Sequence, residues 1–321
     1  MKVVVTGGAG FIGANLCREL AERPGVQQVV ALDNLSTGAA ENLADINAEL
    51  VVGSILDRSL LQDVVDGADA VVHLAARPSV PRSVADPVAS HEANATGTLY
   101  VLEACRRDGI PVVAASSSSV YGPTPELPKH EGMATRPQSP YAAGKLAAES
   151  YVLAHGATYG MRTLALRFFN VYGPLQSVGH AYAAVIPAFV DAALRRQPLR
   201  VHGDGQQTRD FTYVGSVVRV IADAVERGVH HDRPVNLAFG SRTSLLGLIR
   251  KIESIVGYDL ETVFEASRPG DVRDSQAADV QLRTLFPGRE PMSLDDGLAQ
   301  TVAWYRAAMR KPESQVSGMV A

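Results

Sequence analysis

The stretch Gly7-Gly8-Ala9-Gly10-Phe11-Ile12-Gly13 constrains the fold more than any other part of the chain. The residues before it, Lys2–Thr6, are β-branched after the lysine, which predicts a short buried strand, and the residues after it predict a helix to about Arg23. Glycines at 7, 10 and 13 permit a tight turn, a close approach of the backbone to a pyrophosphate, and close packing of the helix on a sheet. The free N–H groups that begin such a helix attract phosphate.

Asp33 lies at the distance from the glycine turn at which dinucleotide-binding proteins have a carboxylate. A second predicted strand, Gln28–Leu32, ends in Asp33, 20 residues after Gly13. A carboxylate at that spacing accepts hydrogen bonds from ribose hydroxyls, although a lone Asp33 is also compatible with a turn or helix cap. The same carboxylate would repel a 2′-phosphate, and Asn34 rather than an arginine follows it. The stretch therefore predicts NAD rather than NADP.

Strands and helices alternate through the first half of the chain. This pattern predicts an α/β fold with a doubly wound parallel sheet, the Rossmann arrangement. Besides the two strands above, the expected elements are strands at Glu49–Gly53, Ala70–Ala75, Val112–Ala115 and Thr163–Asn170 and a helix at Asn94–Arg107. Ligands bind at the carboxyl ends of such strands. We therefore expect one crevice at Gly7–Gly13, Asp33, Ala75–Arg77, Ser116–Ser119 and Phe168–Val171.

The character of the sequence changes near residue 171, where prolines and a Gly203-Asp204-Gly205 turn divide the chain into shorter pieces. We expect residues 1–170 to form mainly the cofactor-binding domain, with some later segments returning to it. Residues 171–310 should form mainly a smaller α/β substrate-binding cap, with helices at Ser244–Val256 and Asp295–Arg310. Residues 311–321 carry no periodicity and should be frayed.

Composition narrows the class of protein. A chain of 321 residues, 46% of them hydrophobic, can bury a sizeable core, and a net charge of -4 gives no reason to expect a nucleic-acid or membrane surface. Two cysteines cannot build a disulfide framework, and the histidines are scattered singly, so no metal site is expected. No stretch is typical of a signal peptide or a membrane span. We expect a soluble, cytoplasmic protein.

The stretch Tyr141–Lys145 follows Pro140, and in a helix its two end residues lie one turn apart on one face. A neighbouring ammonium lowers the pKa of a phenol, so the pair is suited to act as general base and acid on a sugar or alcohol hydroxyl. The serine run at 116–119 could supply a hydroxyl to the same oxygen. A tyrosine four residues before a lysine is common in ordinary helices. Here the pair follows the glycine turn, Asp33 and the serine run in that order, which favours a catalytic role.

Taken together, these motifs resemble the extended short-chain dehydrogenase/reductase superfamily, the NAD-dependent nucleotide-sugar epimerases and dehydratases. The resemblance spans roughly residues 1–310. It rests on Thr6–Gly13, Asp33–Gly38, His73–Ala76, Ser116–Gly122, Tyr141–Lys145, Arg167–Gly173, Gly203–Gly205, Arg209–Phe211 and Arg268–Asp271. Two further stretches, Ser79–Ser83 and Ala181–Pro187, resemble bacterial UDP-N-acetylhexosamine 4-epimerases of surface-polysaccharide synthesis.

The resemblance implies a role for each matching residue. Ser117, Tyr141 and Lys145 would be catalytic: Tyr141 deprotonates the sugar 4-hydroxyl while its hydride passes to NAD, and the 4-keto sugar turns and takes the hydride back. The implied NAD-binding residues are Gly7, Gly10, Phe11, Ile12, Asp33, Asn34, Ser36, Thr37, Gly38, Ser54, Ile55, Leu74, Ala75, Ala76, Tyr141, Lys145, Phe168 and Val171. The implied substrate-binding residues are Ser79, Arg82, Ser117, Ser118, Asn170, Tyr182, Val185, Val201, His202, Arg209, Arg268, Asp271 and Ser275.

Departures from the family pattern refine the expected chemistry. Ser54 stands where relatives commonly have an acidic residue near adenine, which implies weaker anchoring of that ring. Ser118 and Ser119 replace the Asp-Glu pair of sugar 4,6-dehydratases, and Ser119 replaces a glutamate of UDP-glucuronate decarboxylases, so the comparison with the family excludes both reactions. Ser275 would line the sugar pocket at a position where a small residue admits an N-acetyl group.

The leading hypothesis is a homodimeric UDP-sugar 4-epimerase acting on N-acetylglucosamine and N-acetylgalactosamine, with glucose and galactose as further substrates. A UDP-glucuronate 4-epimerase is the alternative enzyme. A non-catalytic NAD-sensing regulator is the alternative of another class, because a fold does not fix a function. Such regulators typically lack the Tyr141–Lys145 pair that this chain has.

Overall fold

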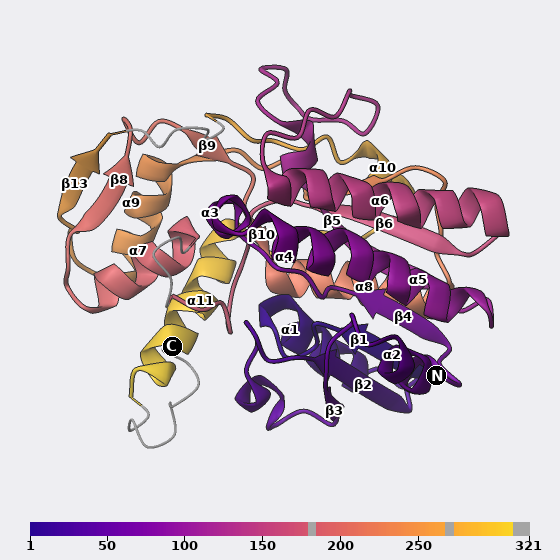
Figure 1. The fold of residues 1–321 in the computed structure, drawn as a ribbon. Helices are drawn as coiled ribbons and strands as arrows, with labels where there is room; N and C mark the ends of the chain where they lie inside the picture. The colour runs from indigo at the N-terminus through magenta and orange to yellow at the C-terminus, as the bar shows by residue number, and fades with distance from the viewer. Residues whose placement is uncertain (179–183, 267–272, 311–321) are drawn as a thin grey trace.

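The computed structural model describes residues 1–178, 184–266 and 273–310. Its centre is a seven-stranded, wholly parallel sheet (Figure 1). From one edge to the other the strands are β11 (Val235–Leu237), β6 (Thr163–Phe168), β5 (Val112–Ser117), β4 (Ala70–His73), β1 (Lys2–Thr6), β2 (Gln28–Asp33) and β3 (Glu49–Val52). Because β1 pairs with both β2 and β4, the strand order reverses beside it, which confirms the doubly wound α/β fold.

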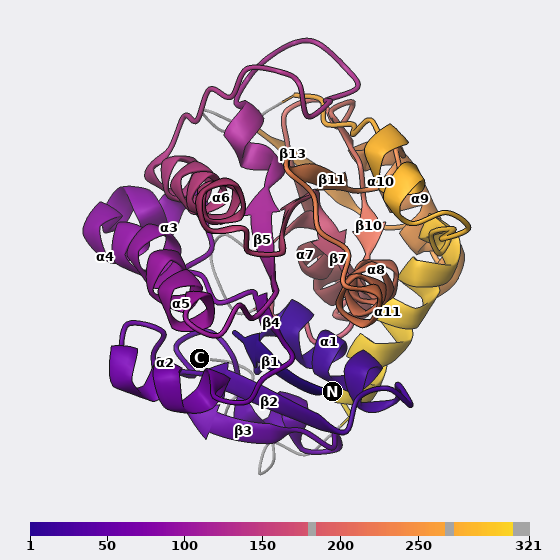
Figure 2. The same ribbon diagram turned by 90° about the vertical axis from the view of Figure 1, so that its right-hand side faces the viewer.

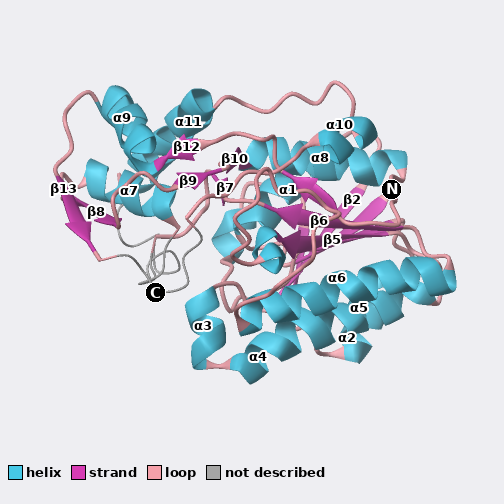
Figure 3. Cartoon of the chain, turned by 90° about the horizontal axis from the view of Figure 1, so that it is seen from above, coloured by secondary structure: helices cyan, strands magenta, loops and turns pink. Residues whose placement is uncertain are grey.

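Helices cover both faces of the sheet (Figures 2 and 3). One layer holds α2 (Arg58–Val65), α3 (Val80–Ala85), α4 (Pro87–His91), α5 (Gly97–Arg106) and α6 (Pro140–Tyr159). The other holds α1 (Phe11–Ala21), α8 (Val214–Arg227) and α10 (Val280–Leu285). Alternation along β1 explains the two layers: Val4 packs in the core beneath α2 and α5, whereas Val3 and Val5 pack in the core beneath α1 and α8.

A smaller unit of helices and short strands stands beside the sheet (Figure 3). Its elements are α7 (Val185–Leu194), α9 (Leu245–Val256) and α11 (Leu294–Ala308), with the strand pairs β7–β10 (Val171–Tyr172, Thr212–Tyr213), β8–β13 (Leu199–His202, Thr262–Glu265) and β9–β12 (Thr208–Arg209, Thr243–Ser244). The core on the α1 and α8 face runs into this unit without a break. Within the described ranges no helix is long and apolar enough to cross a bilayer.

The strands and helices expected from the sequence are present, and several begin or end a few residues away from the expected bounds. The helix expected over Asn94–Arg107 begins as a π-helix, Glu92–Thr96, which runs into α5 at Gly97. Two 3-10 turns, η1 (Ala40–Leu43) and η3 (Ser118–Tyr121), complete the elements. Strand β11 lies in sequence between elements of the smaller unit yet extends the central sheet, so the chain returns to the sheet after residue 170 and then re-enters the smaller unit. That domain boundary stays a prediction, and the expected frayed tail, residues 311–321, lies outside the described residues.

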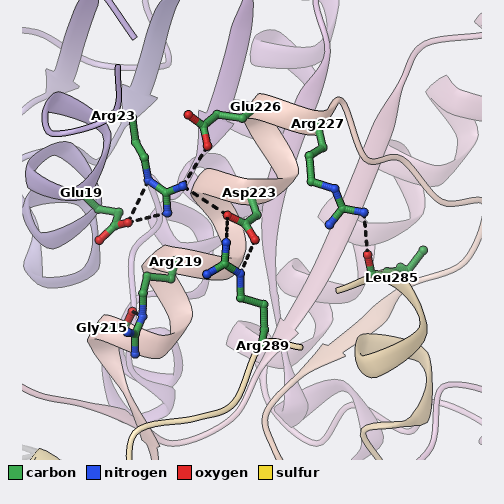
Figure 4. A network of polar contacts seen from close by, with 9 residues as sticks. All are labelled: Glu19, Arg23, Gly215, Arg219, Asp223, Glu226, Arg227, Leu285 and Arg289. Carbon is green, nitrogen blue, oxygen red and sulfur yellow. Dashed lines mark hydrogen bonds and ion pairs between the residues drawn. The ribbon is translucent and has the colours of Figure 1, made fainter. Parts of the chain in front are cut away.

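A charge network ties α1 to α8 and to the segment before α11 (Figure 4). Arg23 donates to Glu19 at 2.6 Å, to Glu226 at 2.9 Å and to Asp223 at 3.4 Å. Asp223 also accepts from Arg289, with Nη2 to Oδ1 at 2.6 Å and a second bond from Nε. Asp223 therefore joins two arginines from distant parts of the chain.

Candidate active site

A cleft of about 1000 Å³ opens at the carboxyl ends of the parallel strands. All five strand ends expected to share one crevice contribute to its lining. The predicted site residues that line it are Gly7, Gly10, Phe11, Ile12, Asp33, Asn34, Ser36, Thr37, Ser54, Ile55, Leu74, Ala75, Ala76, Arg82, Ser117, Ser118, Tyr141, Lys145, Phe168, Asn170 and Val171. The structure confirms that these residues lie together around one cleft. The ligand that each of them contacts stays a prediction.

The glycine turn has the shape that a pyrophosphate requires. A Cβ at Gly13 would lie 2.0 Å from the Gly7 carbonyl oxygen, and one at Gly7 would lie 2.7 Å from the Ala75 nitrogen, so neither position accepts a side chain. Gly10 is different, because a Cβ there would meet only the Gly7 oxygen at 3.2 Å and would otherwise project into open space at the cleft. Gly10 is also the N-cap of α1, and no side chain caps that helix, so its first N–H groups remain open to an anion.

Asp33 lies at the end of β2 and is only 8% exposed. Its Oδ2 accepts from the Ala9 N–H at 3.0 Å and its Oδ1 from the Leu35 N–H at 2.8 Å. Burial raises the pKa of Asp33, and the backbone N–H groups partly oppose that shift. A carboxylate has about four acceptor sites, so Asp33 can still accept from a ribose hydroxyl, and the residues present fit the adenosine half of NAD.

The catalytic helix begins as the sequence indicates. Ser139 is the N-cap of α6 and accepts from the Ala142 N–H at 3.1 Å, Pro140 occupies the first turn, and the helix ends at Gly160 with φ +67°. Gly144 lets the helix pack closely, since a Cβ there would lie 3.2 Å from Asn94 Cβ. Ser117 and Tyr141 both line the cleft, and the Ser117 side chain lowers the pKa of the phenol, so two of the three predicted catalytic residues lie together.

One expectation about this group is wrong. The spacing of Tyr141 and Lys145 predicted that the ammonium would lower the pKa of the phenol. In the structure Lys145 Nζ instead donates to the Ala115 carbonyl at 3.0 Å. Burial raises the pKa of Tyr141, and the Ser117 side chain partly opposes that shift. Burial also lowers the pKa of Lys145 to about 8.

Ser117 is held in place from its other side. Its hydroxyl oxygen accepts from the Ser119 N–H at 3.2 Å and lies 2.9 Å from Ser119 Oγ. This arrangement caps η3, which turns the chain sharply after β5 and leaves Ser117 at the cleft. The local turn that positions the hydroxyl is therefore built by the serine run itself.

Several predicted substrate-binding residues lie beyond the described cleft lining. Ser79 caps α3 and has φ +94°, a strained backbone for a residue with a side chain. Ser275 donates its N–H to the Thr208 carbonyl at 3.1 Å, next to Arg209, which itself donates to the Thr208 and Arg273 carbonyls at 3.0 and 2.9 Å. Val185 and His202 lie in the smaller unit. Gly38, which was predicted to bind NAD, also lies outside the described lining, and a Cβ there would lie 2.8 Å from the Ala9 backbone.

Val201 requires a correction. Its side chain has no exposed surface and packs in the core of the smaller unit, so the expected side-chain contact with a ligand is not available in this structure. The predictions for Tyr182, Arg268 and Asp271 lie outside the described residues. They remain predictions.

The cleft also contains residues that the sequence did not single out. Gln176 lines it, with Nε2 donating to the Val171 carbonyl at 3.2 Å and Oε1 buried without a partner among the described residues. Glu92 lines it as well. Arg77, which the sequence placed in the crevice as part of Ala75–Arg77, also lines the cleft and forms an ion pair with Asp86 at 2.7 Å. A single glutamine in a loop or a single glutamate on a helix carries no periodic signal, which is why Gln176 and Glu92 were not predicted.

Comparison with known proteins agrees with the fold and the cleft. Residues 3–238 match the family model described as "NAD dependent epimerase/dehydratase family". A UDP-glucose 4-epimerase of Mycolicibacterium smegmatis is 37% identical over 314 residues, which cover 95% of this chain and 99% of the relative. Among solved structures, a UDP-N-acetylglucosamine 4-epimerase of Methanobrevibacter ruminantium is 35% identical with a TM-score of 0.90, covering 96% of this chain and 99% of that one. A UDP-glucuronic acid 4-epimerase of Bacillus cereus is 30% identical with a TM-score of 0.88, covering 96% and 100%.

Fold and cleft together define an extended short-chain dehydrogenase/reductase, an enzyme class that uses a bound dinucleotide. Within that class, the chain belongs to the NAD-dependent epimerase/dehydratase family. Its cofactor is NAD.

Proposed function

We propose that the protein is a UDP-sugar 4-epimerase that interconverts UDP-N-acetylglucosamine and UDP-N-acetylgalactosamine, with UDP-glucose and UDP-galactose as further substrates. The observation that carries the proposal is that Ser117, Tyr141 and Lys145 line one cleft, with serines rather than carboxylates at 118 and 119. Dehydration and decarboxylation call for a carboxylate beside the catalytic hydroxyl. Among the described residues that line the cleft the carboxylates are Asp33 and Glu92, neither of which belongs to that strand end.

When bound, NAD supplies the hydride acceptor and donor for the sugar C4 carbon. The chain supplies the rest of the chemistry. In its phenolate form Tyr141 would take the proton of the 4-hydroxyl and later return it, and the Ser117 hydroxyl would hydrogen-bond the same sugar oxygen and lower the pKa of the phenol, opposing the effect of burial. The Lys145 ammonium adds positive charge to the floor of the cleft.

Purified protein is expected to interconvert the two N-acetylhexosamine nucleotides without added reductant. Tyr141→Phe removes the proton acceptor and should abolish turnover while the protein stays folded. Ser150→Ala, an exposed change two turns further along α6, is the matched control and should leave turnover unchanged. Absence of turnover of every UDP-hexose by NAD-loaded wild-type protein would refute the proposal.

A UDP-glucuronate 4-epimerase is the second candidate, and Arg82 favours it. This arginine lines the cleft, and no carboxylate of the described residues pairs with it, so its guanidinium could hold the carboxylate of a hexuronate. Initial rates on UDP-glucuronate and UDP-N-acetylglucosamine separate the two candidates. In the glucuronate enzyme, Arg82→Gln would lower the rate on UDP-glucuronate far more than the rate on UDP-glucose.

An NAD-sensing regulator on the same fold would bind NAD and never reduce it when a nucleotide sugar is added, which the same assay would show.

We also propose a homodimer formed by α5 and α6. The resemblance supports it, and so does the outer face of α6, where Tyr151 is 40% exposed. Light scattering on the purified protein measures the assembly mass directly.

A further inference from the structure

Beneath the cleft, three buried polar side chains join α6 to two strands of the sheet. Ser116 Oγ donates to Glu149 Oε2 at 2.6 Å. Arg167 donates to the same carboxylate twice, from Nε to Oε2 at 2.9 Å and from Nη2 to Oε1 at 2.6 Å. The three residues are 4%, 4% and 3% exposed, and we call Ser116, Glu149 and Arg167 the anchor cluster.

Each member of the anchor cluster adjoins the candidate active site. Glu149 follows Tyr141 by eight residues and Lys145 by four, so the three side chains form one stripe along α6. Ser116 directly precedes Ser117 on β5. The cluster therefore connects the helix that carries the phenol with the strand that carries its hydroxyl partner.

The anchor cluster is fixed from behind as well. The Arg167 guanidinium lies over the Tyr121 ring, 4.6 Å from its centroid. Tyr121 Oη donates to Asn236 Oδ1 at 2.6 Å, and Asn236 Nδ2 donates to the Ala278 carbonyl at 3.2 Å. The orientation of Arg167 is therefore set by groups that reach the β11 edge of the sheet.

A buried ion pair is a poor way to gain stability. Removing both charges from water costs about as much as their attraction returns, and apolar side chains could fill the same volume. What the cluster provides is direction, because a guanidinium fork and a hydroxyl meet a carboxylate in only one arrangement. Three such bonds restrict how α6 can slide or rotate over β5 and β6.

We propose that the anchor cluster is a positioning device, which sets the height and rotation of α6 over β5 and thereby the placement of Tyr141 against Ser117. Glu149 and Arg167 are not among the residues that line the cleft, and Ser116 lines it while its hydroxyl donates to Glu149, so we treat all three as positioning residues rather than catalytic ones. The proposal rests on the proposed function, because the site it orients is the 4-epimerase site. A displacement of about 1 Å between reacting groups can cost on the order of 100-fold in rate.

Ser116→Ala is the sharpest perturbation, since it removes one bond and leaves the ion pair intact. The matched control is Ser216→Ala, a serine 3% exposed on α8 whose hydroxyl accepts from the Met292 N–H at 2.9 Å, on the opposite face of the sheet. Ser116→Thr is the conservative variant, because it keeps the hydroxyl that donates to Glu149.

In the epimerase assay, Ser116→Ala should lower kcat by about tenfold while KM for the sugar nucleotide changes by less than about twofold. Ser116→Thr should recover most of that kcat. Ser216→Ala should lower the melting temperature to a similar degree and leave kcat unchanged. If the two alanine variants lose equal stability and both keep the wild-type kcat, the anchor cluster is merely structural and the proposal is refuted.

A readout without turnover separates this proposal from the proposed function. Hydrogen–deuterium exchange of the amides in the first turns of α6 should be faster in Ser116→Ala than in the wild type and unchanged in Ser216→Ala. If the wild-type protein proves inactive on every UDP-sugar, the proposed function fails and exchange alone decides. Equal exchange in all three proteins would then overturn the positioning role.

Discussion

Asp210 allows the sharpest stability prediction, for the substitution Asp210→Asn. The side chain is fully buried in the smaller unit. Its Oδ2 accepts from the Gly240 N–H at 3.1 Å and the Ala277 N–H at 3.0 Å, and its Oδ1 accepts from Ser241 Oγ at 2.8 Å. Burial raises the pKa of this carboxyl from 3.8 to about 6, against the opposing effect of these hydrogen bonds.

The sign of the effect follows from that shift. Because the folded pKa exceeds the unfolded one, folding favours the protonated form, and the stability that Asp210 contributes is greatest below pH 3.8 and declines as the pH rises through about 6. The difference between about 6 and 3.8 is about two pKa units. At about 1.4 kcal/mol for each unit, the ionised group costs about 3 kcal/mol at pH 7.

Asparagine fits the same bonds without the charge. Its amide oxygen can accept from Gly240 and Ala277, and its amide nitrogen can donate to Ser241 Oγ. Asp210→Asn should therefore raise the free energy of unfolding by up to about 3 kcal/mol at pH 7 and by almost nothing below about pH 4.

Urea unfolding of the wild type and of Asp210→Asn across this pH range measures the difference. Asp45→Asn, which changes an exposed aspartate in a turn, is the control and should follow the wild-type curve. A variant less stable than the wild type at pH 7 would refute the reasoning, since it would mean that hydrogen bonds to the carboxylate outweigh the cost of burying its charge.

Three further predictions follow from single contacts. Ser275→Tyr should suppress turnover of UDP-N-acetylglucosamine and spare UDP-glucose, because the ring fills space that the N-acetyl group needs; equal losses on both substrates would show that Ser275 is no gate. Asp223→Ala should lower the free energy of unfolding by about 2 kcal/mol, less at high salt, because Arg289 and Arg23 lose their shared carboxylate. Gly13→Ala should abolish NAD binding and lower the melting temperature, because its Cβ would lie 2.0 Å from a backbone oxygen.

The sequence predicted the cofactor half well because its signals are local. The strand before Gly7, the carboxylate at Asp33 and the helix that starts at Pro140 each follow from neighbouring residues, and the structure confirms all three elements. The direction of the Lys145 ammonium could not be predicted, since it depends on the Ala115 carbonyl of a strand 30 residues away. The i, i+4 spacing specifies which face two side chains share and not which acceptor each one reaches.

The second half of the chain was harder to predict for a different reason. Strand β11 is three residues long, Val235–Leu237, and only its pairing with β6 makes it a strand. The burial of Val201 likewise depends on how helices of the smaller unit close over it. Such placements depend on contacts between residues far apart in sequence, which no local pattern carries.

The return of the chain to the central sheet has a consequence for how this enzyme can be divided. Helix α8 covers one face of the sheet and β11 completes the edge beside β6, yet both are encoded after the smaller unit begins. A fragment ending at residue 170 would leave the β6 edge unpaired and the apolar residues beneath α8 in water, which are the conditions for edge-to-edge aggregation. The cofactor-binding half is therefore no transferable module, and gene fusions or split-protein designs would have to retain residues through β11.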